Sequence, residues 1–328
     1  MKRKSAFILT LALVVALGVC AFAFTACGAT ESVSLDKTSL GLTVGESVTL
    51  VATVEPEGSS ETVWSTSDEK VVTVSDGKVT AIGAGTATVT VKAGDKSATC
   101  EVTVANKAVS NAEELLTAVD GAQKGDIILM NKGEYTINRT LMMDTDNVTL
   151  TANGDVTIKS ADEWTTTDVG QHGLFTVVAD NVTLEGFTVK GATKHEDDGH
   201  GAGTGSGINV TYKVVDGAQK GCENVVIRNV NSTDNAGCGI IVSSSKVKLE
   251  NVNTSGNGWG GVNVAAKYGA VVLDVDEDCA FGEAGQIYSD SGEENITVNV
   301  PSDYKKVTSE DAPGVVCLLY TSDAADEL

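Results

Sequence analysis

Two consecutive stretches of the chain, residues 224–245 and 246–267, align with each other without a gap. Each places Val and Ile or Leu two apart, then Asn-Val-Asn, then a turn with Asn and Gly, then a short apolar run. A fixed period between 20 and 50 residues indicates a solenoid, in which each unit buries its apolar side only by stacking on its copies. The repeat therefore predicts a coil of stacked rungs.

The same motif marks the start of a rung at four places. Asn-Val-Thr-Leu occurs twice, and Asn-Val-Val-Ile and Lys-Val-Lys-Leu follow; the four begin at Asn147, Asn181, Asn224 and Lys246. Their spacings are 34, 43 and 22 residues. If one rung takes 22 residues, the longer intervals must hold loops outside the coil, within 155–175 and 191–222.

Alternation along a strand sends successive side chains to opposite faces. We expect Val225, Ile227, Val247 and Leu249 to point inward, and Val226, Arg228, Lys248 and Glu250 to point outward. A second strand of each rung is expected at 207–210, 239–242 and 261–264, and two later strands at 271–275 and 296–300.

These rungs resemble the right-handed parallel β-helix of the pectate-lyase-like superfamily, over residues 107 to about 300. The expected fold class is all-β, with a β-helix at 127–316. The resemblance implies a fold on which many enzymes cleave acidic polysaccharides. The chain carries no motif of any one of those enzyme families, so activity does not follow from the fold.

Residues 31–105 predict a separate small antiparallel β-sandwich, because short alternating runs at 48–54, 71–74, 78–81 and 86–91 are divided by turn residues. The segments 63–68, 77–81 and 85–91 resemble the bacterial immunoglobulin-like group 2 family. The resemblance implies a spacer or adhesive domain without catalytic residues. Trp64 is interpreted as the core aromatic of the sandwich rather than as a sugar platform.

Residues 106–126 are expected to form a linker and a short helix. Ser110 and Glu113 have the spacing of a capping box ahead of Leu115, Leu116 and Val119, and Gly121 or Gly125 would end the helix. Because a solenoid needs its open end covered, we expect this helix to cap the coil. A helical surface for a partner is the alternative.

The N-terminus has three basic residues, an apolar run from Ala6 to Phe24, and small residues before Cys27. This pattern predicts a secretory signal at 1–26. Its end resembles the bacterial lipobox, which implies lipid attachment at Cys27 and a tether at 27–30; Phe24 departs from the usual aliphatic residue. An uncleaved membrane anchor is the alternative. Either interpretation places the rest of the chain at the extracellular face of a bacterial cell membrane, held there by its anchor.

The last residues, 317–328, resemble the translation of a transposase sequencing adapter. We therefore expect residues 317–328 not to belong to the fold, and further rungs to have followed residue 316 in the natural protein. A genuine tail of unusual composition is the alternative.

The net charge is −22, and it stays the same when both ends are removed. Such acidity argues against binding of nucleic acid or of free polyuronate by charge alone. No cofactor is implied, although Ca²⁺ would fit as a bridge between carboxylates. The four cysteines that remain between the ends show no metal-ligand spacing and are interpreted as isolated buried thiols: Cys100, Cys222, Cys238 and Cys279. Disulfides between them are the alternative, because an exported compartment permits them.

Candidate catalytic residues are few. Cleavage by β-elimination needs a cation or Arg to neutralise a uronate and a Lys or Arg to remove a proton. After the signal segment the chain has only two arginines, Arg139 and Arg228. Stacking places Arg228 between Glu185 and Glu250, as in an ion-pair ladder. Asp234 is the outward turn acid that a hydrolase would use, provided that a second carboxylate lies on a neighbouring rung.

Three other features have both a binding and a structural interpretation. The loop with His195, Glu196, Asp197, Asp198 and His200 would suit a ligand or metal, but its glycine-rich sequence is more typical of a solvated loop. Trp259, between glycines, would stack on a sugar or pack over the next turn. Pairs of asparagines one rung apart are interpreted as stacked ladders: Asn229 with Asn251, Asn231 with Asn253, and Asn235 with Asn257.

The functional hypothesis is a surface lipoprotein that binds a glycan or a host surface partner through a β-helix held on an immunoglobulin-like spacer. A polysaccharide lyase or glycoside hydrolase is the first alternative, and a stalk without ligand is the second.

Overall fold

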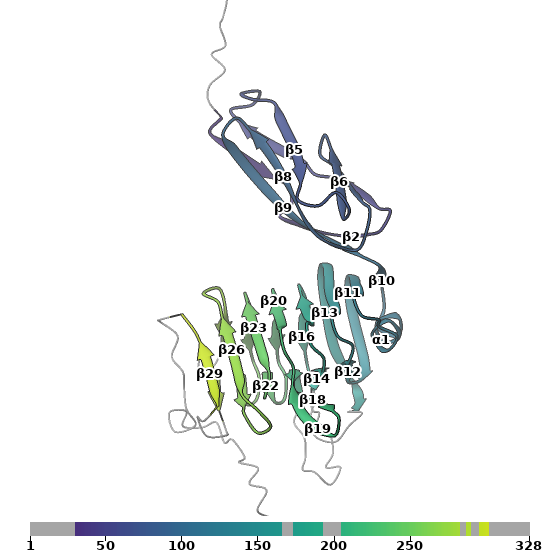
Figure 1. Cartoon of the computed structure of the whole chain (residues 1–328), viewed down its shortest axis with the longest axis vertical. Coiled ribbons are helices and arrows are strands. Elements are labelled where there is room, and N and C mark those ends of the chain that lie inside the picture. The colour runs from purple at the N-terminus through teal and green to yellow at the C-terminus, as the bar shows by residue number, and fades with distance from the viewer. Residues whose placement is uncertain (1–29, 166–172, 193–204, 283–286, 290–294, 302–328) are drawn as a thin grey trace, which may run out of the picture.

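The protein is described from a computed structural model, which covers residues 30–165, 173–192, 205–282, 287–289 and 295–301. It is built almost entirely of strands, with one helix in the described part. A small sandwich lies against the side of a coil of parallel strands, near its first rungs, and β9 (Lys96–Ala105) and β10 (Lys107–Val109) lead from one to the other (Figure 1). The signal segment, Cys27 and residues 317–328 lie outside the described residues. No helix that the model describes is long and apolar enough to cross a bilayer.

The sandwich is built of nine strands in three small sheets. These strands are β1 (Ser32–Leu35), β2 (Ser39–Thr43), β3 (Ser47–Thr49), β4 (Ala52–Glu55), β5 (Thr62–Thr66), β6 (Val72–Ser75), β7 (Lys78–Ala81), β8 (Gly85–Ala93) and β9 (Lys96–Ala105). Alternate residues of β8 and β9 face a common core; Val89, Cys100 and Val102 are each fully buried. The alternating pattern of the sequence thus becomes the inner and outer sides of the sandwich.

Two features of the sandwich differ from the sequence expectation. The run 48–54 is split into β3 and β4, because the chain changes partner there: Leu50 N donates to Gly77 O, whereas Val51 N donates to the carboxylate of Asp36. The sandwich is also not wholly antiparallel, since β2 pairs with β9 in parallel. Neither change is visible in a pattern that reports only which face a residue occupies.

Trp64 packs against the core of the sandwich and is only partly buried. A Cβ on Gly77 would lie 3.2 Å from the Trp64 ring, so the indole covers this glycine turn at the margin of the core. Trp64 therefore packs on the core, as expected, but not at its centre.

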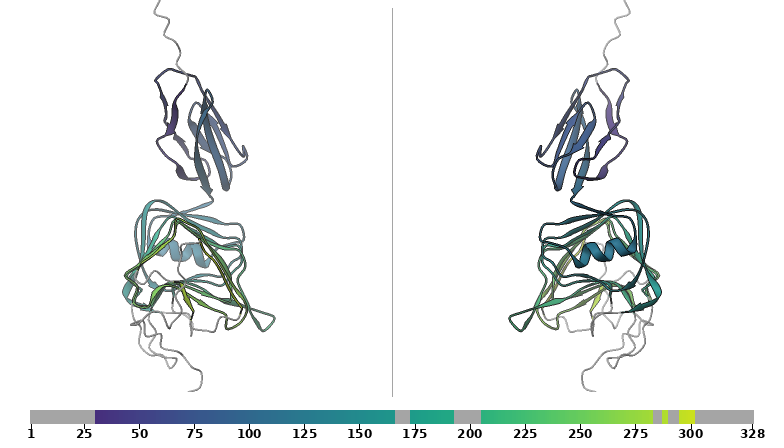
Figure 2. Two further views of the ribbon diagram at one scale, coloured as in Figure 1. Left: turned by 90° about the vertical axis from the view of Figure 1, so that its left-hand side faces the viewer. Right: turned by 90° about the vertical axis from the view of Figure 1, so that its right-hand side faces the viewer.

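The coil has three strands in each rung, which form three parallel faces around one apolar interior (Figure 2). The first face contains β10 (Lys107–Val109), β15 (Thr183–Glu185), β20 (Val225–Arg228), β23 (Lys246–Glu250), β26 (Val271–Val275) and β29 (Ile296–Asn299). The second face contains β16 (Thr188–Lys190), β21 (Asn231–Thr233), β24 (Asn253–Ser255) and β27 (Ala280–Phe281). The third face contains β12 (Leu141–Met143), β14 (Gly173–Val177), β17 (Ser206–Val210), β22 (Cys238–Ser243), β25 (Gly260–Ala265) and β28 (Ile287–Ser289). Two long strands, β11 (Ile127–Arg139) and β13 (Thr149–Thr165), run along both the first and second faces.

The strand register confirms the rung spacing. Thr149 pairs with Thr183, Thr183 with Val226, and Val225 with Val247. The expected inward residues are buried, and the expected outward residues are at least partly exposed. The sequence did not reveal the second face, because its strands β16, β21 and β24 are only three residues long. A strand that short gives almost no alternation to detect.

The helix α1 (Ala112–Asp120) closes the first rung, as expected, with Leu115 and Val119 buried in the core of the coil (Figure 2). Its cap is displaced by one residue from the predicted one. The Asn111 side chain accepts from Glu114 N, and Glu114 Oε2 accepts from Ser110 N at 2.7 Å. Gly121 ends the helix with its N–H on Thr117 O. Asparagine and serine both favour the N-cap position, so the sequence alone gave no preference between the two registers.

The second long interval between rungs contains a hairpin that sequence reasoning missed. Strands β18 (Tyr212–Val215) and β19 (Ala218–Gly221) pair antiparallel and leave the coil after β17. They return to it at Cys222, which is fully buried. Val214 is 66 % exposed near the tip of this hairpin.

The predicted asparagine ladders are present. Asn251 Nδ2 donates to Asn229 Oδ1 at 2.8 Å, Asn253 to Asn231 at 3.2 Å, and Asn235 Nδ2 to Asn257 Oδ1 at 2.8 Å. The last pair is buried and also bonds turn backbone, as when Asn257 Nδ2 donates to Ser232 O. Internal ladders thus satisfy the polar groups of the turns.

A glycine near the start of β17 and another near the start of β22 give the buried ladder its space. A Cβ on Gly207 would lie 2.0 Å from Ser232 Oγ, and one on Gly239 would lie 2.9 Å from Asn257 Nδ2. These two glycines of the sequence motif are therefore required by side chains of the next rung.

The packing of the capping helix predicts that Leu115 and Leu116 contribute differently to the free energy of unfolding. We expect Leu115→Ala to lower the free energy of unfolding of the β-helix by about 2–5 kcal/mol, because it leaves a cavity against the first rung. Leu116→Ala is the matched control, since Leu116 is only partly buried, and it should cost clearly less. Urea unfolding monitored by circular dichroism measures both, and equal losses would show that α1 does not seal the coil.

Candidate functional site

The outer side of the second face carries a series of polar side chains on successive rungs. The strand register stacks them in two rows, Thr157, Thr188, Asn231 and Asn253 in one, and Lys159, Lys190, Thr233 and Ser255 in the other. We call these eight residues the polar face. All are at least partly exposed, while the residues between them point inward. Parallel strands repeat every 4.7–4.9 Å or so, which gives the polar face a regular spacing along the coil.

The hydrogen bonds within the polar face leave many of its donors and acceptors unused. Asn231 Nδ2 donates to Thr188 Oγ1 at 3.4 Å, and Asn253 Nδ2 donates to Asn231 Oδ1 at 3.2 Å. An amide can donate twice and accept twice, so each asparagine keeps groups for a ligand. Lys159 pairs with Glu134 at 2.5 Å, whereas Lys190 has no ion-pair partner in the described part of the chain. The surface therefore offers mixed donors and acceptors with little net charge.

Arg228 lies between Glu185 and Glu250 in the register, as predicted, but its contacts are different. Its Nε lies 2.9 Å from Glu185 Oε1, and Nη2 donates to Glu185 Oε2 at 3.2 Å. The second partner is Glu101 of the sandwich, 3.4 Å away, while Glu250 pairs with Lys248. Burial acts to lower the pKa of Arg228, but Glu185 and then Glu101 and Glu250 outweigh it and raise the pKa. Such a guanidinium is a poor proton acceptor.

Asp234 does not meet a second carboxylate in its own row. It is exposed and has a left-handed backbone, with φ of 56°. The strand pairing places Gly191 and Gly256 at the equivalent positions on the rungs before and after. Within the described residues, Asp234 therefore has no second carboxylate at the equivalent position of a neighbouring rung, which a hydrolase would need.

The other predicted sites give little support for binding. Trp259 is partly buried at its turn, and its backbone N–H donates to Gly237 O at 3.1 Å. Residues 195–200, which include both loop histidines and the three acids, lie outside the described residues. Among the residues that are described, no group of three or more His, Cys, Asp or Glu side chains is placed to hold a metal ion.

The third face carries polar groups that sequence reasoning passed over. Thr176 and Asn209 are register partners and alternate with the inward residues of β14 and β17. They are 0 % and 5 % exposed, and Thr176 Oγ1 and Asn209 Oδ1 have no hydrogen-bond partner among the residues that the structure describes. An unsatisfied buried group costs about 1–3 kcal/mol. Their signal in the sequence was a polar residue at each outward position of an apolar strand. Because they are closed to solvent, the polar face is the more accessible candidate.

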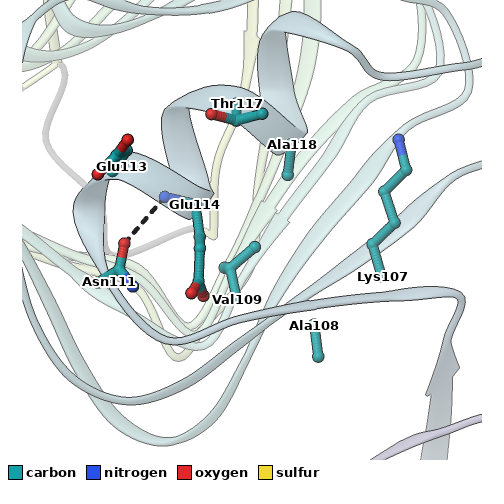
Figure 3. Close-up of a pocket in the computed structure, with 8 residues that line it drawn as sticks. All are labelled: Lys107, Ala108, Val109, Asn111, Glu113, Glu114, Thr117 and Ala118. Carbon is teal, nitrogen blue, oxygen red and sulfur yellow. Dashed lines mark hydrogen bonds between the residues drawn. The ribbon is translucent and has the colours of Figure 1, made fainter.

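A cavity of about 560 Å³ lies between β10 and α1 (Figure 3). Its charged groups already have structural partners. Lys107 Nζ pairs with Asp126 and donates to Gly121 O, and Glu114 accepts from Ser110 N. The charged groups that line this cavity therefore hold the capping helix in place, and this structural role explains their presence.

The four cysteines between the chain ends are buried and form no disulfide with one another in the described part. Burial raises the pKa of Cys222 and of Cys279 to about 12, and that of Cys100 to about 11, from an ordinary value of 9.0. Cys100, Cys222 and Cys279 are therefore protonated at neutral pH and unsuited to nucleophilic chemistry.

Residues 29–104 match the family model described as a bacterial Ig-like domain (group 2). The sandwich is a bacterial Ig-like domain. A comparison with curated proteins finds no match to this chain. The match ends before the coil begins, so it assigns no function to the β-helix.

Three solved structures resemble the chain. A proposed glycosyl hydrolase from Parabacteroides merdae is 17 % identical, with a TM-score of 0.41, over 62 % of this chain and 91 % of that one. A pectin methylesterase variant in complex with a hexasaccharide is 13 % identical, with a TM-score of 0.33, over 59 % and 62 %. A pectin methylesterase from Erwinia chrysanthemi is 12 % identical, with a TM-score of 0.30, over 62 % and 68 %. At these values the comparison says nothing about activity.

The ion bridge of Arg228 predicts a loss of stability on mutation. Arg228→Ala leaves Glu185, whose side chain is only 14 % exposed, without its cation. Because this pair is partly buried, we expect the free energy of unfolding to fall by about 1–3 kcal/mol, more than for a surface pair. Lys248→Ala, at a side chain 54 % exposed, is the control and should cost less than about 0.5 kcal/mol. Equal effects in urea unfolding would contradict this difference.

The raised pKa values of the buried thiols predict that the stability of the protein depends on pH. Since the folded pKa is raised above 9.0, the native state keeps protons that the unfolded state releases, and stability should fall as pH rises above about 9. At pH 8, iodoacetamide should label the four thiols only after unfolding, as read by peptide mass spectrometry. Rapid labelling of native Cys222 would show that its burial is transient.

Proposed function

We propose that this protein is an extracellular surface protein, lipid-anchored through Cys27, that binds a polysaccharide through its polar face. The Ig-like domain acts as the spacer that holds the β-helix away from the membrane. The observation that carries the proposal is the open double row of hydroxyl, amide and amine groups on successive rungs. The location follows from the N-terminal sequence pattern.

The geometry suits an extended polymer. The rows repeat at the spacing of parallel strands, which is close to the length of one sugar unit in an extended chain. Successive sugars can therefore meet equivalent side chains on successive rungs. Each contact is weak by itself, and affinity accumulates along the face because the sites are linked.

Catalysis receives less support from the described residues. Arg228 is held by two carboxylates, and Asp234 has glycines at the equivalent positions on both neighbouring rungs. Binding without bond cleavage is the simpler function for the polar face.

The proposal predicts retention without turnover. The ectodomain should be retained on at least one immobilised plant or host polysaccharide. It should release neither unsaturated ends, followed by ultraviolet absorbance, nor reducing sugar, with Ca²⁺ or with chelator. Calcium-dependent absorbance would indicate a lyase, and reducing ends alone would indicate a hydrolase. Absence of retention on every polymer would favour the stalk.

The polar face is tested by Asn231→Ala combined with Asn253→Ala. Both residues lose amide groups on the face, so retention should weaken at least about fivefold if each of the two contacts contributes on the order of 0.5–1.5 kcal/mol. Asn299→Ala is the control, because Asn299 is an exposed asparagine on the first face that bonds Asp274 in the same ladder fashion. Unchanged retention by the double variant would move the site elsewhere.

A further inference from the structure

The Ig-like domain and the β-helix meet in a defined contact near the first rungs (Figure 1). Arg228 Nη2 donates to Glu101 Oε1 on β9 and to Glu185 Oε2 on β15. A Cβ on Gly41 would lie 2.8 Å from Leu129 Cδ1, so the backbone of β2 packs directly on β11. One ion bridge and one close backbone contact therefore join the two domains.

A cleft of about 410 Å³ lies between the domains at this contact. Strands β2 and β9 form one wall, and β13 with the turns after β15 and β20 forms the other. Glycines contribute to both walls, Gly41 on the sandwich side and Gly154 and Gly186 on the coil side, so few side chains fill the space. The volume lies within the range of small-molecule sites, which favours a compact ligand over a polymer running through.

The cleft presents several kinds of hydrogen-bonding group. Hydroxyls come from Ser39 and Thr103 of the sandwich, and an amide comes from Asn153 of the coil. Asn229 also lines it; its Oδ1 accepts from Asn251, and its Nδ2 remains as a donor. A ligand that bears several hydroxyls can use donors and acceptors of both domains at once.

The charge of the cleft selects among such ligands. The carboxylates of Glu101 and Glu185 face it, and one guanidinium, that of Arg228, neutralises one of them. Two further charged pairs nearby are internally neutral, Lys132 with Asp155 and Lys248 with Glu250. The excess is one negative charge, which favours an amine and repels a uronate.

We propose that this interdomain cleft is a second binding site, for a single sugar unit that is neutral or carries an amine. The site does not depend on the polar face and goes beyond the function proposed above. It exists only where the two domains meet, because each contributes a wall. Occupancy therefore also holds the spacer and the coil together.

The test titrates the whole ectodomain with glucosamine, glucose and glucuronate, by calorimetry and by the shift in thermal unfolding. We expect glucosamine to bind most tightly, glucose less tightly, and glucuronate at least tenfold more weakly than glucosamine. Asn153→Trp places a large ring in the cleft without touching the ion bridge and should abolish binding. Asn299→Trp, on an exposed strand elsewhere, should bind as the parent does.

Each contrary result has one meaning. Glucosamine binding that survives in Asn153→Trp, equal binding of glucuronate, or absence of binding by all three sugars would overturn the cleft site. The polar-face variant Asn231→Ala with Asn253→Ala should retain glucosamine binding while losing polysaccharide retention. Loss of polymer retention alone therefore leaves the cleft proposal intact, and loss of sugar binding in Asn153→Trp alone leaves the polar face intact.

Discussion

The structure depends on one constraint, the stacking of each rung in register on the next. A rung of about 22 residues has an apolar interior that it cannot bury alone, and its strands have no hydrogen-bond partners until a neighbour supplies them. Register follows from this requirement. A slip of one residue would turn Ile227 and Leu249 outward and bring Arg228 and Glu250 into the core.

The turns between strands also have to stack in register from one rung to the next. Chain direction changes at residues with left-handed backbone, and asparagine accepts that conformation more readily than most residues; Asn147, Asn181, Asn224, Asn229 and Asn251 all have φ between 49° and 61°. Stacking then brings several of their amides into bonding distance. The asparagines thus shape the corner and tie it to the next rung, which explains their recurrence without a ligand.

Stacking also decides where ligands can be recognised. A side chain on one rung is repeated by its register partner on the next, so a surface becomes a row rather than a point. The polar face follows from this property and suits a polymer. The interdomain cleft follows from the opposite situation, a place where the regular coil meets a different domain and a compact volume is enclosed.

The sequence by itself determined the coil, its register on the first and third faces, the separate sandwich and the capping helix. These features depend on periodic burial, and the order of apolar and polar residues along the chain shows that period directly. The second face was missed because three-residue strands such as β16 carry no period. The parallel pairing of β2 with β9 and the Glu101 contact to Arg228 were decided only by tertiary structure. Both contacts join residues that are far apart in the chain. A local sequence pattern does not show which distant residue a strand or a charged side chain will contact in the folded protein.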